Sequence, residues 1–389
     1  MADTIKIGNL DISAFKVGGN DCSIYLGDTL LYPQSTPTIK DYLTFVASES
    51  GTFKFSGNSI NYSLDSGATW TELASDTSTP TLESGDTIMW KGDMTPTLSV
   101  GIGTFSSTCN FVVEGNVMSL LYGDDFESQT ILSGKTNAFR DMFAGCTTLT
   151  SINMSLPATT LSTNCYRGMF SGCTSLTSVE NLVLPASELA NYCYSRMFYG
   201  CTSLTTAPEL SGTTLAEHCY NRMFYGCTSL TTAPELPATT LAENCYESMF
   251  QGCTSLTTAP ELSATTLAYR CYYNMFNRCT SLTTPPQLPA TTLAIGCYYG
   301  MFYQCSSLTT SPMLPAPTLV QDCYRQMFYN SAKLNTVTCL AETGINTNNS
   351  TSNWLSNTSS SGTFYRAKDI SWPTGNSGHK TWTLVDYSG

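Results

Sequence analysis

The sequence is poor in charge and nearly without histidine. Only 12% of its 389 residues are Asp, Glu, Lys or Arg, and histidine occurs only at His218 and His379. An ordinary soluble domain carries about 25% charged residues. Two histidines leave little material for acid–base catalysis or for a histidine-based metal site. The composition therefore disfavours an enzyme, and we expect no catalytic residues, no cofactor and no bound metal.

Basic residues and long apolar runs are also scarce. Lys and Arg number 17 against 29 Asp and Glu, a net charge of -12, so no basic face remains to neutralise the phosphates of a nucleic acid. No apolar run reaches the ~18 residues that would insert into a membrane. The first residues, MADTIKIGNL, lack the basic start and apolar centre of a secretory signal. We expect a protein made in the cytoplasm that leaves it, if at all, by another route than general secretion.

What the sequence does contain is a repeat of about 26 residues. A Met-Phe pair recurs eight times between Met142 and Met327, and the last five steps are 26 residues each. One unit, residues 227–252, reads CTSLTTAPELPATTLAENCYESMFQG. Units of this length with a constant apolar skeleton stack into a solenoid, in which each unit covers the apolar face of its neighbour.

Apolar residues four apart predict a helix in each unit. Leu241, Cys245, Met249 and Cys253 would form one stripe over about three turns. Thr214 and Thr240, each followed three residues later by Glu, resemble capping boxes, and Gly200, Gly226 and Gly252 stand where a left-handed residue would end the helix. The preceding SLTTAPEL predicts a strand shortened by its proline. One strand and one helix at this period are typical of leucine-rich repeats.

Fourteen of the 17 cysteines fall into two series at the repeat spacing. Within a unit they lie eight residues apart, about 12 Å along a helix, which is too far for a disulfide. The spacing does not fit zinc ligands either. We interpret both series as buried small apolar residues rather than as metal or redox sites. The first cysteine ladder is Cys165, Cys193, Cys219, Cys245, Cys271, Cys297 and Cys323; the second is Cys146, Cys173, Cys201, Cys227, Cys253, Cys279 and Cys305.

The predicted architecture is an α/β leucine-rich-repeat solenoid of about eight strand–helix repeats, preceded by small all-β domains and closed by a C-terminal cap. Residues 1–37 are an expected β attachment segment, 38–116 a small β-sandwich, 117–140 an N-terminal cap, 141–339 the solenoid and 340–389 the C-terminal cap. The Ser/Thr/Asn-rich stretch 346–362 reads as a loop. Side chains expected inside the sandwich are Phe53, Phe55, Tyr62, Leu64, Trp70 and Trp90.

Six positions of each repeat vary while the others stay nearly constant: six, five, two and one residues before the Met, and two and three after it. Tyr occupies eight of the 42 such positions between the Met169 and Met327 units, Asn seven, Arg six and Lys none. Tyr and Arg without Lys is the composition of a recognition surface. The candidate binding residues are Tyr192, Arg196, Tyr199, Asn221, Arg222, Tyr225, Tyr269, Arg270, Tyr273, Tyr299, Tyr303, Arg325 and Tyr329.

Two other interpretations of exposed residues remain open. Solvent-facing positions can vary without any ligand, although drift normally supplies Lys, Glu, Ala and Thr. Uniform Thr pairs such as Thr205-Thr206 on the strand side suit hydrogen bonding between repeats better than recognition. A tyrosine that recurs beside the first cysteine ladder is expected to pack inside; its members are Tyr166, Tyr194, Tyr220, Tyr246, Tyr272, Tyr298 and Tyr324.

The blocks GCTSLTTAPELPATTLA and CYxxMF, as in residues 226–250, resemble the BspA-like leucine-rich-repeat family of gut-anaerobe proteins. Residues 51–70, 88–97 and 362–378 are similar to segments that accompany such repeats, and 15–33 resembles the leader of structural proteins of phages that infect these bacteria. The resemblance implies adhesion at cell surfaces without catalysis. We expect a virion protein (tail fibre, tail tip or capsid decoration) that contacts other virion proteins through its N-terminal β part and a host glycan or protein through the solenoid. The alternatives are a bacterial surface adhesin and a purely structural decoration without ligand.

Overall fold

The computed structural model describes residues 41–96, 101–179, 181–375 and 377–388, together with four short strands nearer the N-terminus. β1 (Ile5–Ile7) pairs antiparallel with β2 (Leu10–Ile12), and β3 (Ile24–Leu26) pairs antiparallel with β4 (Thr29–Tyr32). These strands agree with the alternating pattern of the first 37 residues. The strand expected in FKVGG, residues 15–19, lies outside the described residues. Residues 1–41 and 42–389 form two separate units.

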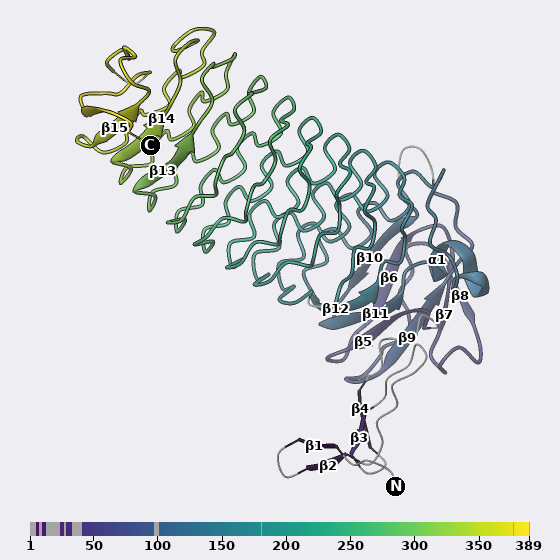
Figure 1. The fold of residues 1–389 in the computed structure, drawn as a ribbon. Coiled ribbons are helices and arrows are strands. Elements are labelled where there is room, and N and C mark those ends of the chain that lie inside the picture. Colours follow the sequence, from purple (N-terminus) through teal and green to yellow (C-terminus); the bar gives the residue numbers. More distant parts are fainter. Residues whose placement is uncertain are drawn as a thin grey trace. The chain divides into compact units, whose positions relative to one another are not determined.

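Two β-sheets open the larger unit (Figure 1). One has the order β12-β11-β5-β9-β7-β8, and the other pairs β10 with β6. The strands predicted from alternating apolar residues are present, whereas β10, in a glycine-containing stretch, was not predicted. The bounds are β5 (Leu43–Ala47), β6 (Phe53–Gly57), β7 (Ile60–Ser63), β8 (Thr71–Leu73), β9 (Thr87–Lys91), β10 (Gly103–Ser107), β11 (Phe111–Asn116) and β12 (Leu149–Ser155).

Aromatic side chains from both sheets meet in one core. Phe45 of β5 contacts Phe53 of β6 and Phe105 of β10, with ring centroids 5.3 and 4.8 Å apart. Trp90 is fully buried, as expected. The prediction for Leu64 was wrong: this residue follows β7 in a turn and is 48% exposed. Trp70 is half-buried, because its ring lies against Tyr42 at the sheet surface.

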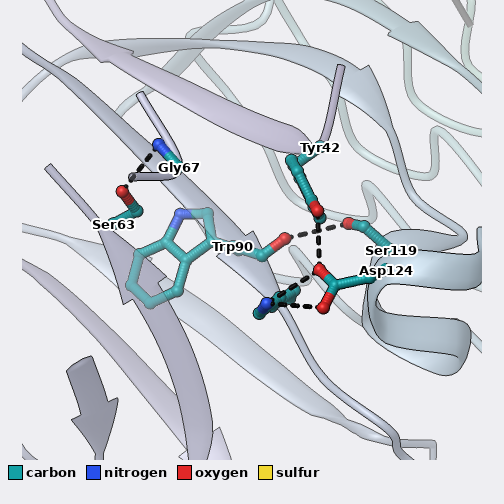
Figure 2. A network of polar contacts seen from close by, with 7 residues as sticks. Tyr42, Ser63, Gly67, Trp90, Ser119 and Asp124 are labelled. Atoms are coloured by element: carbon teal, nitrogen blue, oxygen red, sulfur yellow. Dashed lines mark hydrogen bonds and ion pairs between the residues drawn. The ribbon is translucent and has the colours of Figure 1, made fainter. Parts of the chain in front are cut away.

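A polar network fastens the short helix α1 (Ser119–Tyr122) and the 3-10 turn η1 (Gly123–Asp125) to the larger sheet, as Figure 2 shows. The Tyr42 hydroxyl donates to Asp124 at 2.6 Å, and the Lys91 ammonium lies 2.7 Å from the same carboxylate. Burial is the larger cause, and the hydrogen bond to Asp124 the second, that raises the pKa of Tyr42 to about 12. Ser119 donates to the Trp90 carbonyl at 2.9 Å. These contacts hold the segment that precedes the first repeat.

The larger sheet continues into the first repeat. β12 belongs to that repeat and pairs in parallel with β11. The ring of Phe143, from the turns just before β12, stacks on Phe105 at 5.5 Å. The β-rich part and the repeats therefore share one hydrophobic core. The domain boundaries at 116 and 140 stay predictions.

The predicted helices are absent from the repeats. Among the described residues α1 is the one α-helix, and the residues expected to be helical form successive turns. In every unit from Met169 to Met327 the residues five and one before the Met and three after it have φ between +49° and +79°. A left-handed residue at every fourth position cannot occur in a right-handed helix. We call the residues from seven before to four after each Met a turn segment.

Hydrogen bonds explain how the turn segments remain ordered. Alternate N–H groups donate within the unit, as from Asn221 to the His218 carbonyl at 3.1 Å. The others donate to the next unit, as from Arg222 to the Glu247 carbonyl at 2.9 Å. An α-helix would instead bond each N–H to the carbonyl four residues earlier. Every second hydrogen bond thus joins neighbouring units, so a turn segment is stable only inside the stack.

The strand side is also less regular than expected in the middle of the solenoid. There the units are joined by isolated bridges, such as Thr232 with Thr258 and Thr258 with Thr284. Regular parallel strands return at the C-terminal end as β13 (Thr310–Leu314), β14 (Thr336–Cys339), β15 (Thr363–Arg366) and β16 (Thr383–Asp386). Proline withholds a donor from the ladder. β13 also contains a proline, Pro312, and its pairing with β14 shifts register between Thr310 and Met313.

The Ser/Thr/Asn-rich stretch forms a further turn of the solenoid, so its interpretation as a loop was wrong. The N–H groups of Tyr324 and Phe328 donate to the carbonyls of Ser350 and Trp354 at 2.9 Å, in the pattern of the preceding units. Asn residues supply the left-handed positions there, as at Asn353 and Asn357. Asn tolerates this conformation because its short side chain bonds locally. The asparagines that suggested a loop are thus the residues this backbone requires.

Inside the solenoid, side chains of one kind stack from unit to unit. Tyrosine rings from Tyr166 to Tyr324 lie 5.8–6.0 Å apart, and phenylalanine rings from Phe143 to Phe328 lie 5.6–5.8 Å apart. All described cysteines are free and buried. The predictions that this tyrosine series and both cysteine ladders are internal are confirmed. Within the described part of the chain, no helix has the length and apolar character needed to cross a bilayer.

Candidate functional site

The variable positions share one side of the stacked turn segments. We call the 42 positions from the Met169 unit to the Met327 unit the recognition face. Three of the six positions in each unit are the left-handed ones. The others alternate with buried Cys, Tyr, Met and Phe, and most of them are accessible, whereas Ser195, Asn221 and Asn277 are buried. The face therefore has a fixed backbone with side chains arranged in columns from unit to unit.

Most of the predicted binding residues are partly accessible on this face. One correction is needed: Asn221 is only 7% exposed, because it lies under Ser195, whose hydroxyl is 3.5 Å from its side-chain oxygen. Tyr269 and Arg270 are exposed, and the following are half-buried: Tyr192, Arg196, Tyr199, Arg222, Tyr225, Tyr273, Tyr299, Tyr303, Arg325 and Tyr329.

The structure brings the aromatic residues together as pairs across neighbouring units. Tyr199 stacks on Tyr225 with ring centroids 4.7 Å apart, and Tyr303 stacks on Tyr329 at 4.9 Å. In such a pair each ring covers one face of the other. A ligand can then contact the ring edges, the hydroxyl groups and the outer ring faces of the pair, but not the two faces that are stacked together.

Two further aromatic contacts extend the columns. Tyr192 stacks on His218 at 4.5 Å, and Tyr273 meets Tyr299 at 4.8 Å with the rings tilted. Burial is the main cause that raises the pKa of Tyr273, so its hydroxyl remains protonated at neutral pH. Stacked rings lose little conformational freedom on binding, which favours their use as contact residues.

Arginine side chains lie over several of these rings. The guanidinium of Arg270 is 5.0 Å from the ring centre of Tyr269 and 5.1 Å from that of Tyr273. Arg325 lies 5.3 Å from the ring of Tyr299. These cation–π contacts hold the guanidinium groups at the surface while leaving N–H donors available.

Carboxylates are unevenly distributed along the recognition face. Glu247 lies 3.5 Å from Arg222 and 4.0 Å from the Nδ1 atom of His218. Arg325 pairs with Asp322 of its own unit at 3.2 Å. Among the described residues, Arg167 and Arg196 have no carboxylate within 4 Å. Arg222 and Arg325 are thus paired with carboxylates. Among the described residues, Arg270 and Arg278 of the Met275 unit lack such a pair, as do Arg167 and Arg196 near the N-terminal end.

Left-handed backbone explains part of the composition that the sequence interpretation assigned to binding. Asn164, Asn244, Asn274 and Asn330 all have positive φ, where Asn is favoured over branched residues. Tyrosine gains no such advantage, and Tyr192 is the one tyrosine of the face at a left-handed position. Tyr and Arg therefore carry the recognition argument, while the count of Asn does not.

The threonine rows on the strand side serve the solenoid itself. The hydroxyls of Thr205 and Thr231 donate to the carbonyls of Thr177 and Thr205 at 3.2 and 3.4 Å. Because these donors are used between units, the rows are a weaker candidate for recognition. Within the described residues no three His, Cys, Asp or Glu side chains come together as metal ligands would.

Comparison with known proteins identifies the repeat region. Two overlapping segments, residues 140–283 and 217–352, match the model of the BspA type leucine rich repeat region, with six copies. Together they cover more than half of the chain. No curated protein and no solved structure matches the chain.

Proposed function

Because the chain belongs to the BspA-type leucine-rich-repeat family, we propose that it is a non-enzymatic adhesion protein whose recognition face binds a glycan or protein on a host cell surface. Leucine-rich repeats supply interaction surfaces, and this solenoid places its variable residues on one side. Its N-terminal β part attaches to other virion proteins. The alternative is that the protein is an adhesin on the bacterial cell surface, with the same recognition face.

The observation that carries the proposal is the pairing of accessible tyrosines on the recognition face. Tyr199 and Tyr225 are half-buried and stacked at 4.7 Å, although nothing in the core requires rings there. At the same position the Met249 unit has Gln251 and the Met169 unit has Ser171. The fold thus accepts polar residues without a ring at this position, and the tyrosines indicate selection for contact. A purely structural decoration would not need them.

The virion setting rests on the resemblance of residues 15–33 to phage structural proteins. If the protein is part of a particle, it should co-sediment with particles purified from a lysate and stay attached after a high-salt wash. Recovery only in the cell envelope fraction would support the bacterial adhesin instead.

The adhesion role is tested with the full-length chain and paired variants. The variant Tyr199→Ala/Tyr225→Ala should lower binding to host cells by about 10-fold or more, because contact tyrosines each contribute about 1–3 kcal/mol. Flow cytometry with labelled protein measures the binding. Tyr199→Phe/Tyr225→Phe retains the stack and shows whether the hydroxyls or the rings provide the contact.

The matched control lies on the strand side of the Met223 and Met249 units. Thr206→Ala/Thr232→Ala alters two exposed residues there and should leave cell binding unchanged. If the tyrosine and threonine variants bind cells as well as the unaltered protein, the recognition face is not used for adhesion, and the chain is better described as structural.

A further inference from the structure

Three arginines from successive repeats gather at the N-terminal end of the solenoid. Arg140, Arg167 and Arg196 stand two, two and one residues before the Met of the first three units. Arg167 therefore lies between its two neighbours along the stack. Backbone hydrogen bonds place these units side by side: the Asp141 N–H donates to the Arg167 carbonyl and the Gly168 N–H donates to the Ser195 carbonyl, both at 2.9 Å. Burial, and after it the charges of Arg140 and Arg196, lower the pKa of Arg167, while the Asp141 carboxylate acts in the opposite direction.

One carboxylate is available for these three cations. Asp141 lies 3.1 Å from Arg140, and both side chains are partly accessible. Neither Arg167 nor Arg196 has an ion-pair or hydrogen-bond partner for its guanidinium among the described side chains. Three cations beside a single carboxylate leave an excess of positive charge, which favours an external anion. The concentration of positive charge is local, because the chain as a whole carries -12.

The surroundings of these arginines suit a saccharide rather than a bare ion. Arg167 lies over the ring of Tyr192 at 5.8 Å. Arg140 and Asp141 also line a pocket of about 360 Å³, together with Ser56, Asn58, Thr95 and Thr104. Small-molecule sites begin at about 300 Å³, and this lining offers hydroxyl and amide groups that match sugar hydroxyls.

We propose that Arg140, Arg167 and Arg196 form an anion subsite that takes the carboxylate or sulfate group of an acidic glycan. This inference rests on the proposed function and specifies its ligand class. Planar guanidinium groups bind carboxylate and sulfate oxygens through paired hydrogen bonds. Neighbouring sugars would then extend toward Tyr192 on one side and the pocket on the other.

The test compares acidic polysaccharides with neutral counterparts on the full-length protein. Biolayer interferometry would use polygalacturonate against its methyl ester, and dextran sulfate against dextran. We expect binding to at least one acidic polymer and none to its neutral partner. Arg167→Gln and Arg196→Gln should each weaken that binding about 10-fold, the loss expected for one hydrogen bond to a charged group. Inorganic sulfate at millimolar concentration should not compete if the sugar contributes to binding.

The control removes a positive charge elsewhere. Lys333 is exposed and outside the recognition face, so Lys333→Gln should leave binding to the acidic polymer unchanged, and thermal melts of all variants should coincide. Equal binding of acidic and neutral polymers, or unchanged binding by both arginine variants, would overturn the subsite. The subsite would also be overturned if the arginine variants lost binding to an acidic protein but kept binding to the acidic polysaccharides. If the tyrosine pair is needed for cell binding and the arginines are not, the subsite fails while the adhesion role stands.

Discussion

At the scale of single residues, the second cysteine ladder provides hydrogen bonds as well as packing. The Sγ atoms of Cys201 and Cys227 lie 3.1 Å from the carbonyl oxygens of Phe170 and Phe198 in the preceding units. Burial raises the pKa of Cys201 to about 12, so the thiol keeps the hydrogen that it donates. At the corresponding position of the last unit Ser331 donates to the Phe302 carbonyl at 2.7 Å. The chain itself therefore contains a serine in this role.

Serine should be tolerated in the second ladder and not in the first. Cys227→Ser can repeat the bond of Ser331, so we expect it to lower the free energy of unfolding by less than about 1 kcal/mol. Cys219→Ser, in the first ladder, buries a hydroxyl for which the described residues show no carbonyl acceptor like that of Cys227, and it should cost about 1–3 kcal/mol. Urea unfolding followed by tryptophan fluorescence measures both. Equal losses would show that the thiol hydrogen bonds contribute nothing.

At the scale of the element, the sequence interpretation identified the turn segment of each repeat but predicted the wrong backbone conformation, a helix, for it. Leu241, Cys245, Met249 and Cys253 are spaced by strict fours. A helical stripe drifts by about 40° at each step of four and must return through steps of three. A chain of turns with every fourth residue left-handed has a period of four without drift. The strict spacing was therefore a signal for turns, although it resembles a helix over a single unit.

The constant residues of the repeat predicted which side chains are buried. They did not predict the hydrogen bonds between units. Constant Cys, Tyr, Met and Phe identified the core because burial depends on side-chain chemistry repeated in each unit. Asn221 was misplaced because its exposure depends on its contact with Ser195 of the neighbouring unit. The bonds between units are likewise made by backbone groups that every residue possesses, so no residue type reveals them.

A substitution at Gln304 distinguishes the backbone of a turn segment from that of a helix. Gln304 has φ of +59°, at the position held by Gly200, Gly226 and Gly252 in other units. Gln304→Gly should raise stability by up to about 1 kcal/mol, because a left-handed residue other than glycine costs about 1–2 kcal/mol. In a helix the same change would lower stability by about 0.8–1 kcal/mol.

Whether Gln304→Gly raises or lowers the stability distinguishes the two backbones. A second variant provides a control. Gln304→Ile should destabilise strongly, since a branched side chain is least compatible with positive φ. Gln304 accepts a hydrogen bond from Arg278 at 2.9 Å, so Gln304→Ala measures the loss of that contact alone. Far-ultraviolet circular dichroism should lack strong helical minima. A destabilising glycine together with a helical spectrum would contradict the turn segment.

At the scale of the whole larger unit, the two ends of the solenoid are covered differently. At the C-terminal end Trp354 stacks on Tyr324 at 6.0 Å and on Trp372 at 5.6 Å, which closes the tyrosine column with indole rings. At the N-terminal end β11 pairs with β12 of the first repeat. An uncovered end would expose both a strand edge and an apolar face, which favours aggregation.

Truncation before the first repeat should therefore remove a necessary cover. A fragment of residues 117–389 lacks β11 and Phe105, so it leaves β12 unpaired and one face of Phe143 uncovered. Each large apolar side chain returned to water costs about 1.5–3 kcal/mol. We expect this fragment to aggregate in size-exclusion chromatography, whereas residues 42–389 should elute as one species with the thermal midpoint of the full chain. If both fragments are monomeric with the same midpoint, residues 117–140 suffice as the cap that the sequence predicted.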